Sequence, residues 1–161
     1  IITNDVEKVN SSASIFSALF TPQGKYLFEF FLIQSKNGYL LDCDNQFTNE
    51  IINYLLKYKL RSKIEITDIS KNYVIGLITL EKFADIQKSE NKTGDTIEFR
   101  NSPLFLDPRN KKLGARILST LEKLHLTIKR LELKIVKPET YFERATSWGL
   151  TIKVIKHWQN Q

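Results

Sequence analysis

The sequence predicts an α+β fold, in which a mostly antiparallel sheet carries packed helices. Aromatic and β-branched runs of strand length are separated by short turns, and apolar residues recur at helical spacing in a few other segments. With 161 residues, of which 42% are hydrophobic, the chain can bury a core without disulfides. Its longest apolar runs fall well short of the roughly 18 residues that a membrane-spanning helix needs, so we expect no membrane partner.

The N-terminal part is typical of a three-stranded meander. Residues 14–20 and 26–33 are strand-like, and Pro22-Gln23-Gly24 lies between them. This step favours a hairpin, because proline presets one backbone dihedral and glycine permits a positive φ. A second turn at residues 35–38 leads to a third strand at residues 39–43. The sheet is therefore expected to be at least partly antiparallel.

An amphipathic helix is expected after the third strand. Asp44 or Asn45 can cap it, because a short side-chain acceptor satisfies the first free amides of a helix. Apolar residues then recur at helical spacing, at Phe47, Ile51, Ile52, Leu55 and Leu56. Beyond the helix, residues 64–69 and 73–78 return to strand character. Residues 82–94 form the most polar window and are expected to be an exposed connection.

The last third of the chain predicts short strands and two helices. The strands are expected at residues 97–99, 104–106 and 115–118. Asp107-Pro108-Arg109 is interpreted as a turn in which Arg109 closes a local ion pair. A helix over residues 120–129 is followed by strand-like alternation at Leu131, Leu133 and Ile135, and then by a helix that begins at Pro138 and ends at Gly149.

The net charge of +6 raises the question of an anionic partner. Of the 24 basic residues, 18 are lysine, in a chain also rich in isoleucine and asparagine, which indicates a general composition bias. Most of the charge is therefore interpreted as solvated surface, with an anionic small ligand ahead of nucleic acid as a partner. Direct nucleic-acid binding is not expected. A basic module that contacts RNA stays open as an alternative, ranked after the three interpretations given at the end of this section. Residues 57–63 form a cluster in which basic residues alternate with other residue types. It is the one basic cluster of the sequence that contains an aromatic residue, Tyr58.

The usual catalytic and metal-binding motifs are missing from the sequence. His125, His157 and Cys43 do not have zinc-site spacing, and neither a phosphate-binding loop nor a dinucleotide-binding glycine motif occurs. Cys43 ends an apolar strand and is interpreted as an inert core residue, with Asp42 and Asp44 facing the opposite side. A single cysteine cannot form an internal disulfide, which favours a reduced, intracellular protein.

The start of the chain suggests an incomplete protein. The sequence contains no methionine and opens on Ile1, without a basic and apolar leader segment. We expect a fragment or a trimmed product, whose missing part would hold some of the chemistry.

Five blocks of sequence resemble the YgfZ family in order and spacing. They are IITNDV (residues 1–6), LFTPQGKYLFEFFL (19–32), GYLLDCD (38–44), YKLRSKIEI (58–66) and DPRNKKLGAR (107–116). That family consists of folate-binding proteins related to the aminomethyltransferase of the glycine cleavage system and to a mitochondrial iron-sulfur assembly factor. The resemblance covers roughly residues 1–118.

The resemblance implies an incomplete GcvT/YgfZ-like fold, in which three domains surround a channel that holds tetrahydrofolate. It implies a role in iron-sulfur cluster assembly or repair, with iron-sulfur assembly or client proteins as partners and an indirect effect on tRNA modification. The location would be the bacterial cytoplasm or the mitochondrial matrix. The expected organisation is a folate-binding-like core at residues 1–90, a partial second region at 91–140 and a divergent tail at 141–161.

The resemblance also suggests which residues bind the folate. They are Asn4, Asp5, Gln23, Gly24, Lys25, Lys59 and Arg61. Asparagine and aspartate side chains match the donors and acceptors of a pterin, and lysine or arginine can pair with the carboxylates of the glutamate tail. Each group has a simpler alternative: a turn or cap for Asn4 and Asp5, a plain hairpin for Gln23 and Gly24, and ordinary surface for the basic pair.

The chain departs from the family pattern at two places that matter for function. The family signature K-x-C-x-[FY]-x-G-Q-E does not occur, and Cys43 is not its cysteine. Phe28-Glu29 stands where the related methyltransferases have an acidic pair. A non-enzymatic binding role is therefore favoured. The alternatives are a one-carbon transferase that uses Glu29, or a truncated product without function.

Overall fold

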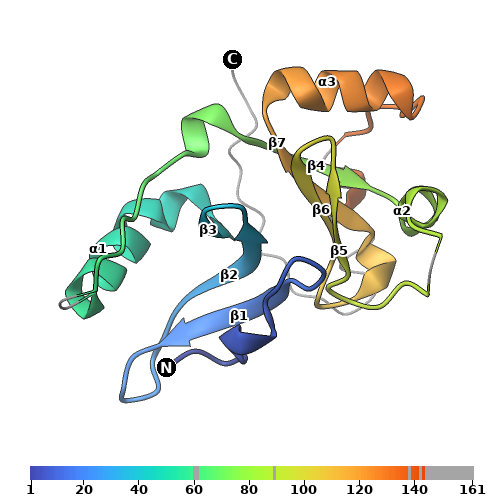
Figure 1. Ribbon diagram of the computed structural model, residues 1–161. Coiled ribbons are helices and arrows are strands. Elements are labelled where there is room, and N and C mark those ends of the chain that lie inside the picture. Colours follow the sequence, from blue (N-terminus) through green and yellow to red (C-terminus); the bar gives the residue numbers. More distant parts are fainter. Residues whose placement is uncertain (60–61, 89, 138, 142, 144–161) are drawn as a thin grey trace.

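The first sheet is the expected antiparallel meander. The computed structural model describes residues 1–59, 62–88, 90–137, 139–141 and 143. Strands β1 (Ile15–Phe20), β2 (Tyr26–Ser35) and β3 (Gly38–Cys43) pair in the order β1-β2-β3 (Figure 1). The two predicted turns connect them, so the α+β class and the meander are confirmed.

Helix α1 (Thr48–Tyr58) covers one face of this sheet. It follows a short 3-10 helix, η2 (Asn45–Phe47), whose first turn is capped by the Asp44 carboxylate accepting from the Gln46 amide at 3.1 Å. The apolar side of α1 packs on β1 and β2 in a core centred on Leu19, Phe28, Phe30 and Ile51. The predicted amphipathic helix and its aspartate cap are therefore confirmed, with one 3-10 turn inserted between cap and helix.

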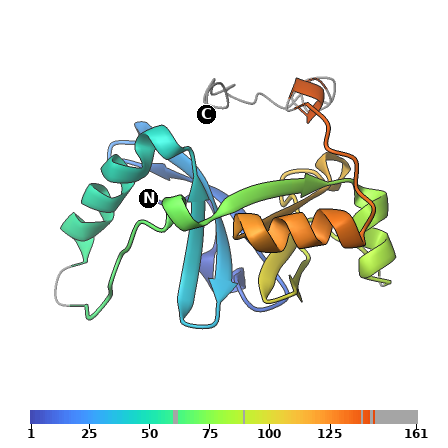
Figure 2. The ribbon, with the colours of Figure 1, turned by 90° about the horizontal axis from the view of Figure 1, so that it is seen from above.

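The second sheet is also antiparallel, with strand order β4-β7-β6-β5. Its strands are β4 (Val74–Ile78), β5 (Thr96–Phe99), β6 (Ser102–Leu106) and β7 (Ala115–Ser119). Helices α2 (Leu80–Ile86) and α3 (Leu121–Arg130) pack beside it (Figure 2). Because β4 pairs with β7, this sheet combines strands from both sides of residue 90.

Gly76 allows α3 to approach the sheet closely. A Cβ atom at this position of β4 would lie only 2.7 Å from a methyl carbon of Leu124, a residue of α3. Below this contact lies the core of the second sheet, whose fully buried members include Phe83, Leu104 and Leu106. A small residue on an edge strand therefore sets how tightly the helix packs.

The two sheets meet through a second face of β2. Successive strand residues point to opposite sides, so Phe30 faces α1 whereas Phe31 and Ile33 face the second sheet. There they pack against Phe105 of β6 and Leu118 of β7. Backbone hydrogen bonds between residues 12–14 and 94–96 also link the sheets. The junction of the two sheets is thus continuous core.

Three segments differ from the sequence-based expectation. Residues 64–69 form no strand, because no neighbouring strand pairs with them, and Ile64 is exposed. The polar window at 82–94 begins inside α2, where Thr79 caps the helix and Phe83 is buried despite its polar neighbours. Residues 131–135 are irregular: Glu132 has φ 51°, and the Leu133 amide donates to the Ile128 carbonyl to close the end of α3.

The other late elements follow the prediction where they are described. The strands expected at 97–99, 104–106 and 115–118 are β5, β6 and β7, and the helix at 120–129 is α3. Pro138 and Gly149, which would bound the last predicted helix, lie outside the described residues. No helix in the described part of the chain is both long and apolar enough to cross a membrane.

Candidate functional site

The expected pterin-binding residues lie in the N-terminal segment, where their polar groups bind backbone. The Asn4 side-chain amide donates to the Phe16 carbonyl at 3.1 Å. The Asp5 carboxylate accepts from the Glu7 amide at 3.0 Å and so caps the 3-10 helix η1 (Val6–Lys8). Both residues are exposed. The geometry is that of the turn and cap considered as the alternative, and the ligand role of these residues stays a prediction.

The Gln23-Gly24-Lys25 turn forms the exposed tip of the β1–β2 hairpin. Gly24 has φ 83°, which favours glycine, and its amide donates to the Thr21 carbonyl at 2.9 Å. The N-terminal segment begins beside this tip and runs back along β1, with the Ile1 carbonyl accepting from the Phe20 amide at 2.8 Å (Figure 1). The structure therefore brings these two groups of expected folate residues onto one sheet edge, formed by β1.

Lys59 belongs neither to β1 nor to the hairpin tip and directly follows helix α1. It caps the C-terminal end of α1, where its amide donates to the Leu56 carbonyl, and its side chain is partly buried. Among the described residues, no hydrogen bond or ion pair joins Lys59 to Asn4, Asp5 or the hairpin tip. Arg61 lies outside the described residues, so its predicted role is not placed by the structure.

Glu29, the carboxylate required by the transferase alternative, lies exposed on β2. Partial burial raises the pKa of the Tyr26 phenol, and the charge and hydrogen bond of Glu29 raise it further. The Glu29 carboxylate therefore forms a hydrogen bond with Tyr26, on the same strand.

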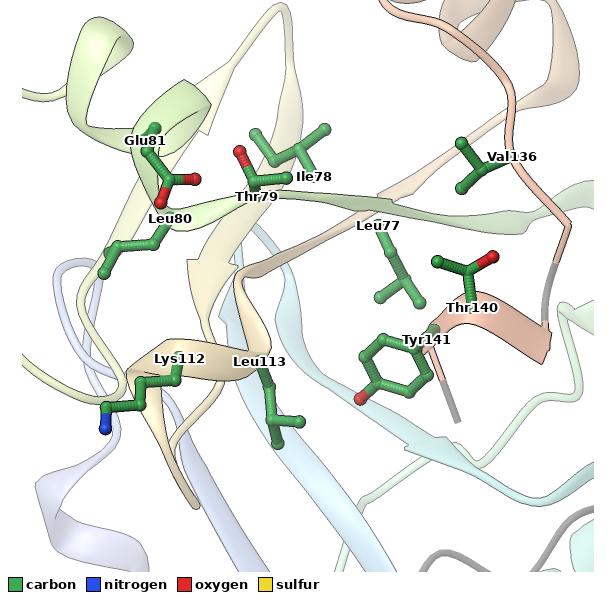
Figure 3. Close-up of a pocket in the computed structure, with 10 residues that line it drawn as sticks. All are labelled: Leu77, Ile78, Thr79, Leu80, Glu81, Lys112, Leu113, Val136, Thr140 and Tyr141. Atoms are coloured by element: carbon green, nitrogen blue, oxygen red, sulfur yellow. The ribbon is translucent and has the colours of Figure 1, made fainter. Parts of the chain in front are cut away.

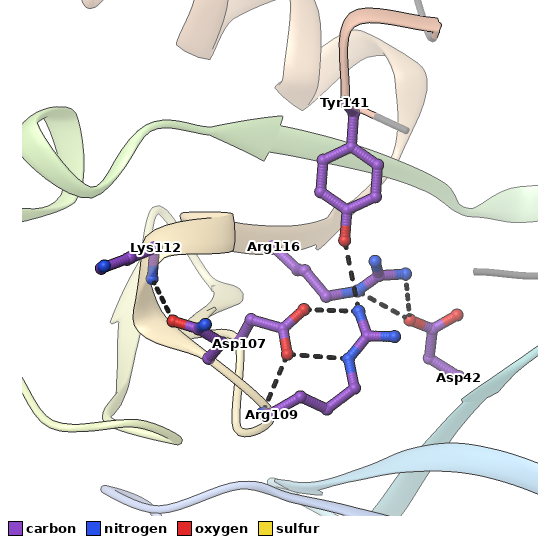
Figure 4. A network of polar contacts seen from close by, with 7 residues as sticks. Asp42, Asp107, Arg109, Lys112, Arg116 and Tyr141 are labelled. Carbon is purple, nitrogen blue, oxygen red and sulfur yellow. Dashed lines mark hydrogen bonds and ion pairs between the residues drawn. The ribbon is translucent and has the colours of Figure 1, made fainter. Parts of the chain in front are cut away.

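A buried ion pair closes the turn between β6 and β7. Both carboxylate oxygens of Asp107 accept from the Arg109 guanidinium, at 2.9 and 2.6 Å, and Asp107 also accepts from the Arg109 amide at 2.9 Å (Figure 4). Only 1% of the Asp107 side chain is exposed. Burial would lower the pKa of Arg109, but the Asp107 hydrogen bonds and charge, with Tyr141, outweigh it and raise the pKa. The predicted turn with its local ion pair is confirmed.

A second ion pair joins the two sheets. The Arg116 guanidinium of β7 donates to the Asp42 carboxylate of β3 at 2.7 and 3.2 Å, and both side chains are largely buried. Asp42 indeed faces away from Cys43, as expected, since Cys43 packs on the α1 side. The guanidinium carbons of Arg116 and Arg109 lie 4.5 and 4.9 Å from the centre of the Phe31 ring, at cation–π distance.

We call Asp42, Asp107, Arg109, Arg116 and Tyr141 the junction network (Figure 4). Its two guanidinium groups lie over the Phe31 ring. Tyr141 joins the network by accepting a hydrogen bond from Arg109 at 3.2 Å. The sequence did not predict the pairing of Asp42 with Arg116. A signal was present, because both residues fall within blocks that resemble the same family, but they lie 74 positions apart.

A pocket of about 490 Å³ lies beside the junction network (Figure 3). Of the ten described residues that line it, five are aliphatic: Leu77, Ile78, Leu80, Leu113 and Val136. The remaining lining residues are Thr79, Glu81, Lys112, Thr140 and Tyr141. None of the expected folate-binding residues that the structure describes lines it. Among the described residues, no group of three or more histidine, cysteine or acidic side chains is arranged to hold a metal ion.

Cys43 is expected to be a poor nucleophile. Burial, followed by the charge of Asp42, raises the pKa of its thiol to about 11, and a hydrogen bond with Thr48 only partly opposes this. Because the thiolate is the reactive form, alkylation by iodoacetamide should be slow at pH 7 and accelerate up to a pH of about 11. Mass spectrometry of the alkylated chain measures this rate, with the urea-unfolded chain as a fast-reacting control. A half-maximal rate below about pH 9 would contradict the burial argument.

Comparison with known proteins identifies relatives of low similarity. The structure defines the chain as an α+β protein with two antiparallel sheets and buried ion pairs at their junction. No family model matches the chain. It is 25% identical over 176 aligned positions to a protein of Mycosarcoma maydis named mitochondrial iron-sulfur cluster assembly factor IBA57 homolog. It is 26% identical over 106 positions to the protein of the same name from Dictyostelium discoideum.

The coverage of these matches is unequal. They include 93% and 66% of this chain, but only 41% and 26% of the relatives. The chain therefore spans less than half the length of the curated relatives it matches. The similarity to IBA57 homologues supports, at low identity, the resemblance inferred from the sequence blocks.

Proposed function

We propose that this chain is part of an iron-sulfur cluster assembly factor that binds a reduced folate. The observation that carries the proposal is the alignment with a protein of that name over 93% of the chain. The proposal includes iron-sulfur assembly or client proteins as partners and an indirect effect on tRNA modification. Because both relatives are named as mitochondrial, we propose the mitochondrial matrix ahead of the bacterial cytoplasm as its location.

The proposed folate site lies along the β1 edge of the first sheet. Asn4 and Asp5 supply polar groups at one part of this edge, and the exposed hairpin tip supplies Gln23, Gly24 and the ammonium group of Lys25. A charge-assisted hydrogen bond from Lys25 would suit a carboxylate of the glutamate tail. Lys59 and Arg61 would act on the same tail. Since the relatives are more than twice as long as the aligned part, a site completed by further domains agrees with the proposal.

Calorimetry with tetrahydrofolate under anaerobic conditions tests the folate part. We expect saturable binding, weakened about tenfold in Lys25→Ala and in Arg61→Ala by loss of a charged partner for the tail. Lys57→Ala is the matched control, because Lys57 is an exposed lysine on α1 outside the proposed site. Circular dichroism shows whether each variant is folded. A folded chain that does not bind, or a Lys57 variant that loses as much affinity, would contradict this site.

A further inference from the structure

The positive charge of the chain is concentrated in one segment. Residues 111–137 contain eight basic residues, Lys111, Lys112, Arg116, Lys123, Lys129, Arg130, Lys134 and Lys137, but only two acidic residues, Glu122 and Glu132. Their net charge of +6 equals that of the whole chain, so the rest of the sequence is neutral overall. A composition bias alone would spread the surplus along the chain.

Five of these eight basic residues lie on three segments around the second sheet. Lys112 lies on the 3-10 helix η4 (Lys111–Leu113), Lys129 and Arg130 end α3, and Lys134 and Lys137 lie on residues 131–137, which we call the strap. All five side chains are exposed. Within the part of the chain that the structure describes, none of the five forms an ion pair. Their charge is therefore available to a partner.

The strap and η4 border the pocket described above. Val136 of the strap and Lys112 of η4 both line it, Lys137 follows Val136 directly, and Lys134 precedes it by two positions (Figure 3). Leu77 and Val136 leave apolar surface open to solvent, with 42% and 66% of each residue exposed. The pocket therefore combines a largely aliphatic lining with Lys112, and two exposed lysines, Lys134 and Lys137, lie on the strap beside Val136; we call these three lysines the basic rim. Among the lining residues that the structure describes, Glu81 is the one acidic residue.

We propose that this basic-rimmed groove docks an acidic protein segment that carries an aliphatic or aromatic anchor residue. The anchor would fill the pocket, and flanking carboxylates would meet Lys112, Lys134 and Lys137. The surface fits a protein segment better than a nucleic acid, because residues 111–137 contain no tyrosine, phenylalanine or tryptophan on which bases could stack, and Tyr141 of the pocket lining is held by Arg109 through its hydroxyl. The proposal does not depend on folate binding, since the expected folate residues within the described part of the chain lie outside the groove.

Fluorescence anisotropy with synthetic peptides tests this docking. The probe is a fluorescein-labelled peptide with a central leucine-tryptophan pair between glutamates and aspartates. One control peptide has lysines in place of the acidic residues, and another has serines in place of the central pair. We expect saturable binding of the probe by the full 161-residue chain, and binding at least about tenfold weaker for each control.

Matched variants locate the binding on the protein. Val136→Asp places a charge in the pocket at an exposed position, and Lys134→Glu/Lys137→Glu reverses the rim. We expect each variant to weaken binding at least about tenfold. The control is Lys57→Glu/Lys63→Glu, which changes the net charge by the same amount as the rim variant, but at exposed positions outside the second sheet. It should change the affinity for the peptide less than about twofold.

The proposal fails on any of four results. The first is that the probe peptide does not bind, and the second is that both charge reversals lower its affinity equally. The third is that Val136→Asp leaves the affinity unchanged. The fourth is that a single-stranded RNA, or vesicles of phosphatidylserine, bind more tightly than the peptide and depend in the same way on Lys134 and Lys137. The last result would assign the surface to a different class of partner.

Discussion

Replacing Arg116 by alanine should lower the free energy of unfolding by about 3–5 kcal/mol. The substitution removes two hydrogen bonds to Asp42, whose side chain is only 11% exposed, and leaves that carboxylate without its cationic partner. It also removes the guanidinium that lies 4.5 Å from the centre of the Phe31 ring at the junction of the sheets. Urea unfolding followed by circular dichroism measures the change.

Two controls separate this effect from a general loss of charge. Lys36→Ala breaks an exposed pair with Glu98, 72% and 55% exposed, and should cost less than about 1 kcal/mol. The double substitution Asp42→Leu/Arg116→Met replaces the buried pair by apolar groups and should be less harmful than Arg116→Ala alone. An Arg116→Ala effect as small as that of Lys36→Ala would show that the Asp42 pair does not hold the sheets together.

Replacing Asp107 by alanine should have an effect of similar size, about 3–5 kcal/mol. Asp107 is almost fully buried and accepts three hydrogen bonds from Arg109, so its loss leaves a largely buried guanidinium without a counter-charge. The turn between β6 and β7 would lose its closing contact as well. Thermal unfolding should show a decrease in Tm of about 6–20 °C for a chain of this size.

The graded variant Asp107→Asn provides the control for the turn. An asparagine oxygen can still accept from the Arg109 amide, whereas the charge is lost, so the decrease in Tm should lie between wild type and Asp107→Ala. Equal stability of all three proteins would contradict the interpretation that Asp107 stabilises the junction network.

Local chemistry made much of the fold predictable. The hairpin at Gly24, the aspartate cap at Asp44 and the ion pair between Asp107 and Arg109 each depend on residues a few positions apart, and each occurs as expected. Helix α2 was missed because its single buried residue, Phe83, stands among polar neighbours in a short segment. The isoleucines at residues 64, 66 and 69 favour a strand by their β-branched side chains, but a strand also needs a partner, which the sequence pattern does not supply.

The candidate site was predictable only in part. The sequence placed Asn4 and Lys25 in separate blocks, and the structure puts both blocks along β1. The pairing of Asp42 with Arg116 depends on how two sheets pack, and the pocket depends on where the strap passes β4. Both are long-range features that periodicity and turn chemistry do not encode.

The central proposal, a role in iron-sulfur cluster assembly, is tested most directly in the cells that make the protein. The measurement compares the activities of iron-sulfur enzymes with those of cluster-free enzymes after the protein is depleted and again after its gene is restored. We expect the iron-sulfur activities to fall and recover while the cluster-free activities stay constant. Iron-sulfur activities that remain unchanged after depletion, or an equal fall in both groups, would contradict the proposal.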